Sequence, residues 1–309
     1  MATEQQSFEG PPRLAVGEGA TTPNPGIAGV LIWSTTVGAI MRWDGTEWSS
    51  RWPGLGFDAG AWQAPLFTPW NSHLAEWTPP GNATTVPGVK GLAALTATGT
   101  ATARNVAMTN AFTRQKRLGY VSATTAGSLS GPRLASAQFT LGDDTNGGFL
   151  FNAVFGCSDA ATVSGARQFV GIFNSIGAPS NVEPSTLTNV IGVGHGAGDT
   201  NLKLYSGGST AQTPIDLGVN FPANTLSADG YLVVIYAPRD PTAAGYKVGW
   251  YVKRLGTAFS ASGVLTGTVG TQLPALTTQL TLNHWRSNNA TALAVGLDIG
   301  AMSLAVPFL

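Results

Sequence analysis

Hydrophobic and polar residues alternate along much of the second half of the chain. Hydrophobic side chains recur at every second position within residues 147–156, 167–174 and 246–255, with polar or small residues between them. This alternation predicts strands that bury one face and expose the other. Residues 231–238 are hydrophobic almost throughout, so we expect this strand to be central and covered on both faces.

Similar segments recur from about residue 89 to the end of the chain. Residues 134–142, 201–208 and 292–309 also alternate, and Gly, Asn, Asp and Pro stand between the segments. About ten short strands without helical periodicity between them are typical of two antiparallel sheets packed face to face. We therefore predict an all-β fold in which residues 89–309 form an antiparallel jelly-roll sandwich.

A tryptophan-rich segment, residues 25–52, precedes the sandwich with the sequence PGIAGVLIWSTTVGAIMRWDGTEWSSRW. Its pattern predicts a small β-hairpin module of three short strands, and Asp44-Gly45 is a pair that tight hairpin turns favour. Large hydrophobic side chains occur on both faces of these strands, and so short a segment has no second layer to cover them. We expect identical chains to cover them in an oligomer. The residues assigned to this contact are Ile32, Trp33, Met41, Trp43 and Trp48.

Two further regions complete the predicted organisation. Residues 1–24 are polar and rich in Pro and Gly, which is typical of an extended arm that becomes ordered by docking on a neighbour. The arm has no basic start followed by a hydrophobic core, so we predict neither a signal peptide nor membrane insertion. Residues 53–88 are interrupted by prolines, which predicts an extended connector.

The charge content narrows the classes of partner. Charged residues make up 10% of the chain and the formal net charge is zero, whereas about 25% charged residues are usual in a soluble domain. A chain without a basic surface offers little to nucleic-acid phosphates, so we predict no nucleic-acid partner. Cys157 is the only cysteine, which excludes an internal disulfide and a cysteine-based zinc cluster.

Candidate catalytic and metal-binding groups are sparse. His73, His195 and His284 lie far apart, and no pair has the spacing of metal ligands. The acidic run 143–148 and the glycine-rich run 194–201 are better explained as turns than as ligand sites. Paired carboxylates for glycoside hydrolysis stay formally possible, but no nucleophile motif is present. We predict a protein that is not an enzyme and holds no metal and no cofactor.

Aromatic residues beside loops are the candidate ligand-binding groups. A sugar ring stacks its hydrophobic face on an exposed indole or phenol, although most aromatic residues of a sandwich belong to its core. Tyr205, Tyr246, Trp285 and Arg286 lie beside loops such as SGGSTAQ and RSNN. We therefore predict that these four residues contribute to a ligand-binding surface.

Two stretches of the sequence resemble bacteriophage tail-fibre and related virion proteins. The tryptophan-rich segment is similar to a small β-module near the N-terminal end of these proteins, and residues 166–208 resemble their lectin-like sandwich. The first resemblance is carried by Gly29, Trp33, Ser34, Thr35, Thr36, Gly38, Trp43, Asp44, Gly45, Thr46 and Trp48. The second is carried by Phe169, Val170, Gly171, Ala178, Pro179, Ser180, Asn181, Pro184, Leu187, Asn189, Ile191, Gly192, Gly194, Gly198, Asp199, Thr200 and Asn201.

The resemblance implies a virion receptor-binding protein that attaches the particle to the bacterial surface. It implies a homotrimer that docks on other virion proteins through the N-terminal arm and binds a bacterial surface glycan or lipopolysaccharide through loops of the sandwich. Such a protein is made in the host cytoplasm and is located on the tail or capsid surface of the virion. The alternative is a structural protein that decorates the capsid or links tail components without binding a receptor.

Overall fold

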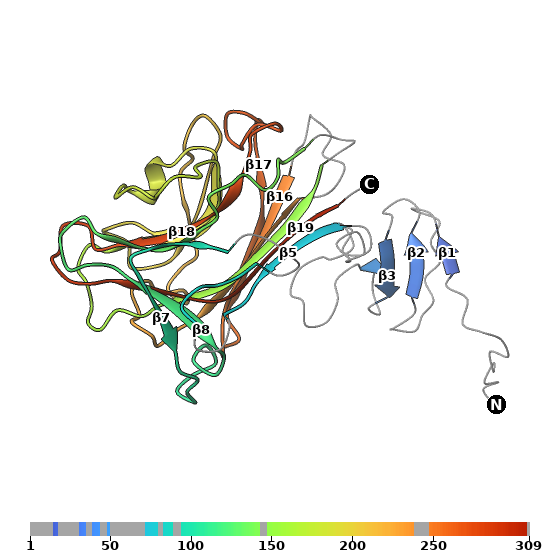
Figure 1. The fold of residues 1–309 in the computed structure, drawn as a ribbon. Coiled ribbons are helices and arrows are strands. Elements are labelled where there is room, and N and C mark those ends of the chain that lie inside the picture. The colour runs from blue at the N-terminus through green and yellow to red at the C-terminus, as the bar shows by residue number, and fades with distance from the viewer. Residues whose placement is uncertain are drawn as a thin grey trace, which may run out of the picture. The chain divides into compact units, whose positions relative to one another are not determined.

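The computed structural model describes residues 15–17, 31–34, 39–43, 48–49, 72–79, 83–88, 94–142, 147–237 and 247–307. The chain divides into two compact units, residues 1–66 and residues 67–309. Figure 1 traces both along the chain. Each unit is described by itself below.

The first unit contains a four-stranded sheet with the order β1-β2-β3-β4. Its strands are β1 (Ala15–Gly17), β2 (Leu31–Ser34), β3 (Ala39–Trp43) and β4 (Trp48–Ser49). β1 pairs with β2 in parallel, and the other pairs are antiparallel. Ile32 lies opposite Met41 in the ladder, and Trp43 lies opposite Trp48. The structure describes the backbone of these strands but not their side chains. The predicted contact through Ile32, Trp33, Met41, Trp43 and Trp48 therefore stays a prediction.

The second unit is a sandwich, and its first layer is an eight-stranded antiparallel sheet. The order is β17-β16-β15-β10-β19-β8-β7, and β5 also pairs with β19. The strands are β5 (Ser72–Trp77), β7 (Thr100–Arg104), β8 (Arg117–Val121), β10 (Phe149–Cys157), β15 (Tyr231–Ala237), β16 (Lys247–Arg254), β17 (Ser260–Thr266) and β19 (Gly296–Pro307).

The second layer is a seven-stranded antiparallel sheet with the order β14-β13-β12-β11-β18-β9-β6. Its strands are β6 (Thr96–Thr98), β9 (Leu129–Arg133), β11 (Arg167–Phe173), β12 (Val190–His195), β13 (Lys203–Gly207), β14 (Ile215–Asp216) and β18 (Thr281–Ser287). A 3-10 turn, η4 (Pro184–Thr186), lies between β11 and β12. The predicted all-β antiparallel jelly-roll sandwich is confirmed. In the described residues, no helix is long and hydrophobic enough to cross a membrane.

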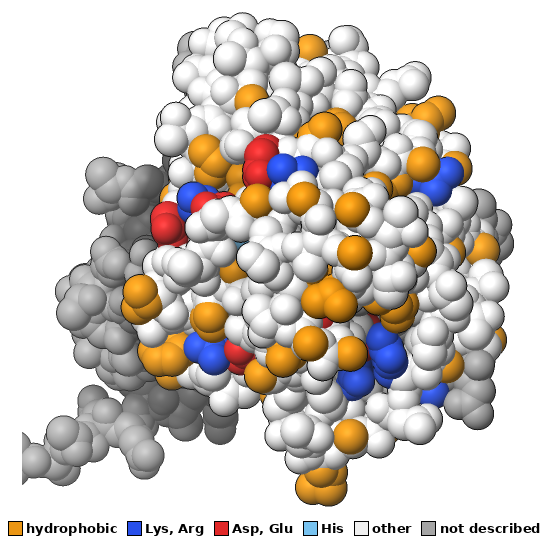
Figure 2. All heavy atoms as spheres, turned by 90° about the vertical axis from the view of Figure 1, so that its left-hand side faces the viewer, with side chains coloured by type: hydrophobic (Ala, Val, Ile, Leu, Met, Phe, Trp, Pro, Cys, Tyr) orange, Lys and Arg blue, Asp and Glu red, His pale blue; other side chains and the backbone are white. Residues whose placement is uncertain are grey.

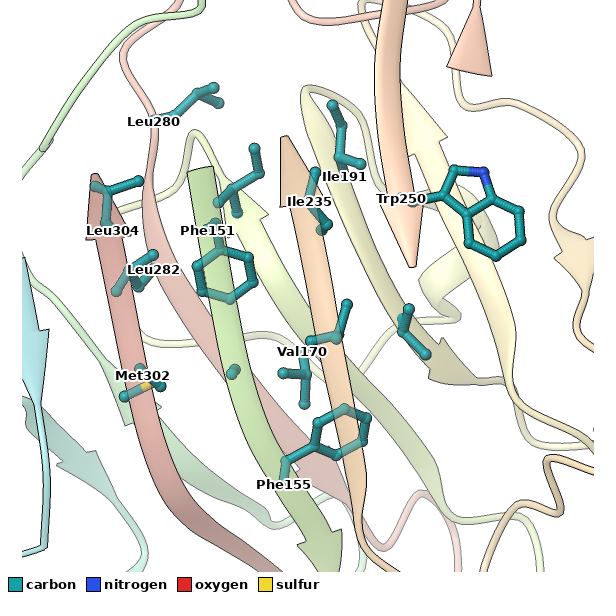
Figure 3. Packing of buried hydrophobic residues seen from close by; sticks show 14 of the residues in the cluster. Phe151, Phe155, Val170, Ile191, Ile235, Trp250, Leu280, Leu282, Met302 and Leu304 are labelled. Atoms are coloured by element: carbon teal, nitrogen blue, oxygen red, sulfur yellow. The ribbon is translucent and has the colours of Figure 1, made fainter. Parts of the chain in front are cut away.

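The hydrophobic core lies between the two sheets. Phe151 and Phe155 of β10 and Ile235 of β15 contribute from one layer, and Val170 of β11 and Ile191 of β12 contribute from the other. Figure 3 shows these side chains in the space between the strands. All five are fully buried. β15 is central in its sheet and nearly buried throughout, as the hydrophobic run 231–238 predicts.

One predicted domain boundary and one predicted strand are wrong. The segment 53–88 was expected to be a connector, but it contains β5, which pairs with β19, and Trp77 at the end of β5 is fully buried in the core. The sandwich therefore begins before residue 89. Residues 134–142 were expected to form a strand, but only Phe139 makes a bridge, with Leu280. The segment pairs with the β18 region only at separate points, through the Leu134 N–H to the Leu282 C=O and through the Gln138 and Phe139 N–H groups to the Leu280 C=O.

Candidate ligand-binding site

Side chains from three parts of the chain meet at one end of the seven-stranded sheet. These parts are the start of β11, the loop between β11 and β12, and the turn between β12 and β13 with the first residue of β13. We use the name polar cluster for Arg167, Asn181, Glu183, Asp199 and Lys203. Figure 2 shows one face of the molecule, where charged side chains are few and acidic and basic atoms lie next to each other.

Asp199 lies in the turn between β12 and β13. Its Oδ2 accepts hydrogen bonds from the Gly196 N–H at 2.7 Å and from the Tyr205 hydroxyl at 3.1 Å, and its Oδ1 lies 2.6 Å from Lys203 Nζ. The side chain of Asp199 is 18% exposed and that of Lys203 is 27% exposed. The carboxylate is therefore fixed in position while part of it faces solvent.

Glu183 forms the neighbouring part of the polar cluster. Its Oε1 accepts a hydrogen bond from Arg167 Nε at 2.8 Å, and its Oε2 accepts one from the Ala197 N–H at 3.2 Å. Arg167 Nη1 also donates to Asn181 Oδ1 at 3.0 Å, and the Ser287 hydroxyl donates to the same oxygen at 2.6 Å. The loop before β12 is thus tied to β11 and to β18.

Glu183 and Asp199 flank the same piece of backbone. The N–H of Gly196 donates to Asp199 and the next N–H, of Ala197, donates to Glu183. A Cβ added at Gly196 would lie 2.5 Å from Glu183 Oε2 and 3.1 Å from Asp199 Oδ2. Glycine at this position therefore leaves the space that lets the two carboxylates approach each other.

The charges of the polar cluster are balanced. Burial disfavours ionisation of Asp199, but the hydrogen bonds from Lys203 and the Gly196 N–H and the charge of Lys203 outweigh it, so the pKa of Asp199 lies below its usual value. Burial and the nearby Asp199 carboxylate raise the pKa of Tyr205 far above its usual value. Tyr205 is therefore a neutral donor, and two carboxylates are matched by two cations.

A buried network lies behind the polar cluster, inside the sandwich. Arg286 of β18 donates from Nε and Nη2 to the Asp159 carboxylate at 3.0 and 2.5 Å, from Nη1 to Gln168 at 3.2 Å and to His195 Nε2 at 2.8 Å, and from Nη2 to Asn224. Arg286 and Asp159 are both fully buried. Every N–H of the guanidinium thus has an acceptor, which a buried charge requires.

His195 connects this network to the polar cluster. Its Nε2 accepts a hydrogen bond from Arg286, so Nδ1 carries the proton and faces the Gly196 C=O at 3.2 Å. Burial and the charge of Arg286 lower the pKa of His195 to about 3, and the ring is neutral. Because Gly196 in turn donates to Asp199, the buried network holds the turn that carries the candidate site.

The structure corrects the predicted ligand-binding set. Tyr205 and Trp285 are 2% and 1% exposed, and they pack with Phe169 and Val190 in a small second hydrophobic cluster. Neither ring offers a face for stacking. Arg286 is fully buried on the opposite side of β18, and Tyr246 lies outside the described residues. Tyr205 does bond to the polar cluster, through its hydroxyl.

Sequence reasoning missed Glu183 and Asp199 as site residues. Both stand among Gly, Asn and Pro, and such neighbours indicate ordinary turns. Gly194 and His195 end β12, and residues 196–199 form the predicted turn, in which Asp199 and, from a different loop, Glu183 accept from neighbouring N–H groups. Their approach depends on strand order, which a single sequence does not reveal. In the described residues, no group of three or more His, Cys, Asp or Glu side chains is placed to hold a metal ion.

The sequence matches no protein-family model and no curated protein. Among solved structures, arcelin-5, a lectin-like defense protein from Phaseolus vulgaris, is 11% identical, with a TM-score of 0.46 over 77% of this chain and 100% of that chain. A protein of unknown function from Shewanella oneidensis MR-1 is 13% identical, with a TM-score of 0.45 over 83% of this chain and 97% of that chain. A carbohydrate esterase from the Shiga toxin-encoding bacteriophage phi24B is 15% identical, with a TM-score of 0.38 over 69% of this chain and 90% of that chain. Likeness at this level identifies neither a family nor a ligand.

Proposed function

We propose that the sandwich binds a glycan at the polar cluster and that its role is attachment, without catalysis. The observation that carries the proposal is the pair of partly exposed carboxylates, Glu183 and Asp199, held on either side of Gly196 beside two cations. A sugar hydroxyl both donates and accepts a hydrogen bond, so it requires an acceptor and a donor close together. The polar cluster offers both in a fixed geometry.

The balanced charge supports a neutral sugar rather than a phosphate or a polycation. Arg167 and Lys203 are paired with Glu183 and Asp199, so an ionic ligand would compete with existing ion pairs. Hydrogen bonds to charged groups are worth about 1.5–3 kcal/mol each. A few of them give a weak single site, which is useful when several copies act together.

The sequence resemblance to phage tail-fibre proteins supports a more specific role. We propose a homotrimeric virion protein on the tail or capsid surface, made in the host cytoplasm and docked on other virion proteins through residues 1–24. Its ligand in that role is a bacterial surface glycan such as the polysaccharide of lipopolysaccharide. The tryptophan-rich segment, residues 25–52, is the proposed trimer contact.

Binding of the full-length protein to a panel of bacterial surface polysaccharides tests the proposal. We expect Asp199→Asn to weaken binding of the best ligand about tenfold, because one charged acceptor is lost, equivalent to about 1.4 kcal/mol. The matched control is Asp216→Asn, since the Asp216 carboxylate on β14 is exposed and accepts hydrogen bonds from Asn201 Nδ2 and the Gly218 N–H, whereas Lys203, which lies opposite it in the ladder, forms its ion pair with Asp199. Equal binding by both variants and by the unchanged protein would place the site elsewhere.

The structural alternative has a different signature. A decorating or linking protein would bind no polysaccharide of a susceptible strain, and particles lacking it would lose physical stability. Particles lacking an attachment protein would stay intact and fail to adsorb to cells. Adsorption and heat resistance of such particles therefore separate the two roles.

A further inference from the structure

The outer edge of β17 is the longest free strand edge of the described sandwich. β17 has seven residues and ends the eight-stranded sheet beyond β16, and no described residue hydrogen-bonds to the backbone on its other side. The other strands at sheet ends are shorter, with six residues in β5, five in β7, three in β6 and two in β14. A free edge of this length is a template for pairing with another strand.

One hydrogen bond fixes which residues of β17 face this edge. The Arg254 N–H donates to the Phe259 C=O across the β16–β17 ladder. Hydrogen-bonded pairs alternate along an antiparallel ladder, so Ala261, Gly263 and Leu265 bond to β16. The residues whose N–H and C=O groups point away from β16 are Ser260, Ser262, Val264 and Thr266.

β17 carries none of the features that keep free edges from pairing. Its sequence, SASGVLT, has no charged residue and no proline, and its ladder with β16 is continuous, without a bulge. Val264 is 46% exposed. By contrast, β7 ends in Arg104 and β5 contains Glu76. Soluble proteins place such charges on edges to prevent association, so the bare edge of β17 indicates an interface.

We propose that β17 pairs antiparallel with β17 of a second copy of this chain, around a two-fold axis that passes beside Gly263. In this register Ser262 lies opposite Val264 of the other copy, and Ser260 lies opposite Thr266. Every residue with open backbone groups then meets another such residue, and each of these pairs exchanges two hydrogen bonds. The two eight-stranded sheets become one continuous sheet.

Three features favour an identical partner over an unrelated strand. Gly263 is the central residue of β17, so a two-fold axis there uses the whole edge. Neither strand carries a charge, so the symmetric contact creates no like-charge pair. The central pair does not exchange hydrogen bonds, and its Cα atoms approach to about 4.5 Å, which glycine permits. This contact is separate from the proposed trimer contact in residues 25–52 and does not depend on glycan binding.

Disulfide formation between introduced cysteines tests the register of the two β17 strands. Full-length Ser262→Cys and Val264→Cys variants are co-expressed, oxidised and compared with each variant alone on a non-reducing gel. We expect a disulfide between the two variants and none within either, because residue 262 faces 264 of the other copy, whereas equal positions lie diagonally about 7–8 Å apart. Cys157 is 5% exposed and stays reduced. No disulfide in the mixture, or one within a single variant, overturns the proposal.

The mass of the protein in solution gives an independent readout. We expect sedimentation of the full-length protein to give an even number of chains, and Val264→Lys to halve that number without changing the circular dichroism spectrum. The control is Thr102→Lys, an exposed position on β7 at the other end of the sheet, which leaves the mass unchanged. An unchanged mass for Val264→Lys, or an odd number of chains in the unchanged protein, overturns the proposal. A loss of mass in both variants also overturns it.

Discussion

At the scale of single residues, Arg286 is the side chain on which the interior of this end of the sandwich depends. It bonds to Asp159, Gln168 and His195 and is fully buried. A buried charge of this kind is tolerated because its partners replace water completely. The network therefore specifies one arrangement of β11, β12 and β18 and positions the turn that carries Asp199.

Removal of Arg286 alone should be strongly destabilising. Arg286→Met leaves the Asp159 carboxylate buried without its partner, and we expect a loss of about 3–5 kcal/mol in the free energy of unfolding. The double variant Asp159→Asn, Arg286→Met removes both charges and keeps an acceptor for the Gly296 N–H, so it should recover at least half of that loss. Guanidinium unfolding measures both. A double variant no more stable than the single one would show that charge is not the cause.

Two buried neutral histidines should make stability fall in mild acid. Burial and Arg286 lower the pKa of His195 to about 3, and burial lowers that of His284 to about 4, whereas an unfolded histidine has a pKa of about 6.5. Below pH about 6.5 the unfolded state binds protons that the folded state does not, so stability is lost as pH falls. The slope should approach about 1.4 kcal/mol per pH unit for each histidine. Urea unfolding between pH 5 and 7 measures it, and His284→Gln should lower the slope by about half.

At the scale of elements, β18 shows what the sequence could and could not reveal. Its sequence, TLNHWRS, contains mostly polar residues, which argues for an exposed edge, yet all seven residues are buried. β18 is central in its sheet, between β11 and β9, and loops cover its outer face. Trp285 and Arg286 were therefore predicted as exposed binding residues and are interior. The burial of the alternating β10 and of the hydrophobic β15 follows their own patterns. β11 is a strand as predicted, but the expectation of one exposed face is wrong, because Val170 and Ile172 lie in the core and Phe169, on the other face, packs with Trp285.

Two glycines, one in a strand and one in a turn, differ in whether the space around them admits a side chain. Gly131 of β9 has φ +143°, and a Cβ there would lie 2.1 Å from the His284 C=O oxygen of β18. We expect Gly131→Ala to cost about 3 kcal/mol or more, because a strained backbone and a clash with a paired strand add. Gly198 has open space around its Cβ position, so Gly198→Ala should stay within about 0.5 kcal/mol. Thermal unfolding compares the two, and equal costs would contradict the packing argument.

At the scale of the whole molecule, attachment requires that one weak site be multiplied. Among the residues whose burial the structure describes, the core of the sandwich is formed from Trp77 onward, and residues 67–309 form a compact unit. We therefore expect residues 67–309 to fold alone and to bind a free oligosaccharide as the full chain does. The full chain should bind a surface coated with the same glycan about a hundredfold more tightly than it binds the free oligosaccharide, since linked copies gain effective concentration. Surface plasmon resonance with free and immobilised glycan measures both quantities.

The same surface measurement shows which contact between chains causes the tighter binding. If the gain in affinity on the surface comes from the tryptophan-rich segment, it disappears when residues 1–66 are removed, and a Val264→Lys change in the full chain leaves most of it. If it comes from pairing of β17, the truncated protein keeps it and Val264→Lys removes it. A protein whose surface binding survives both changes would bind as single chains, and assembly would then have no part in its function.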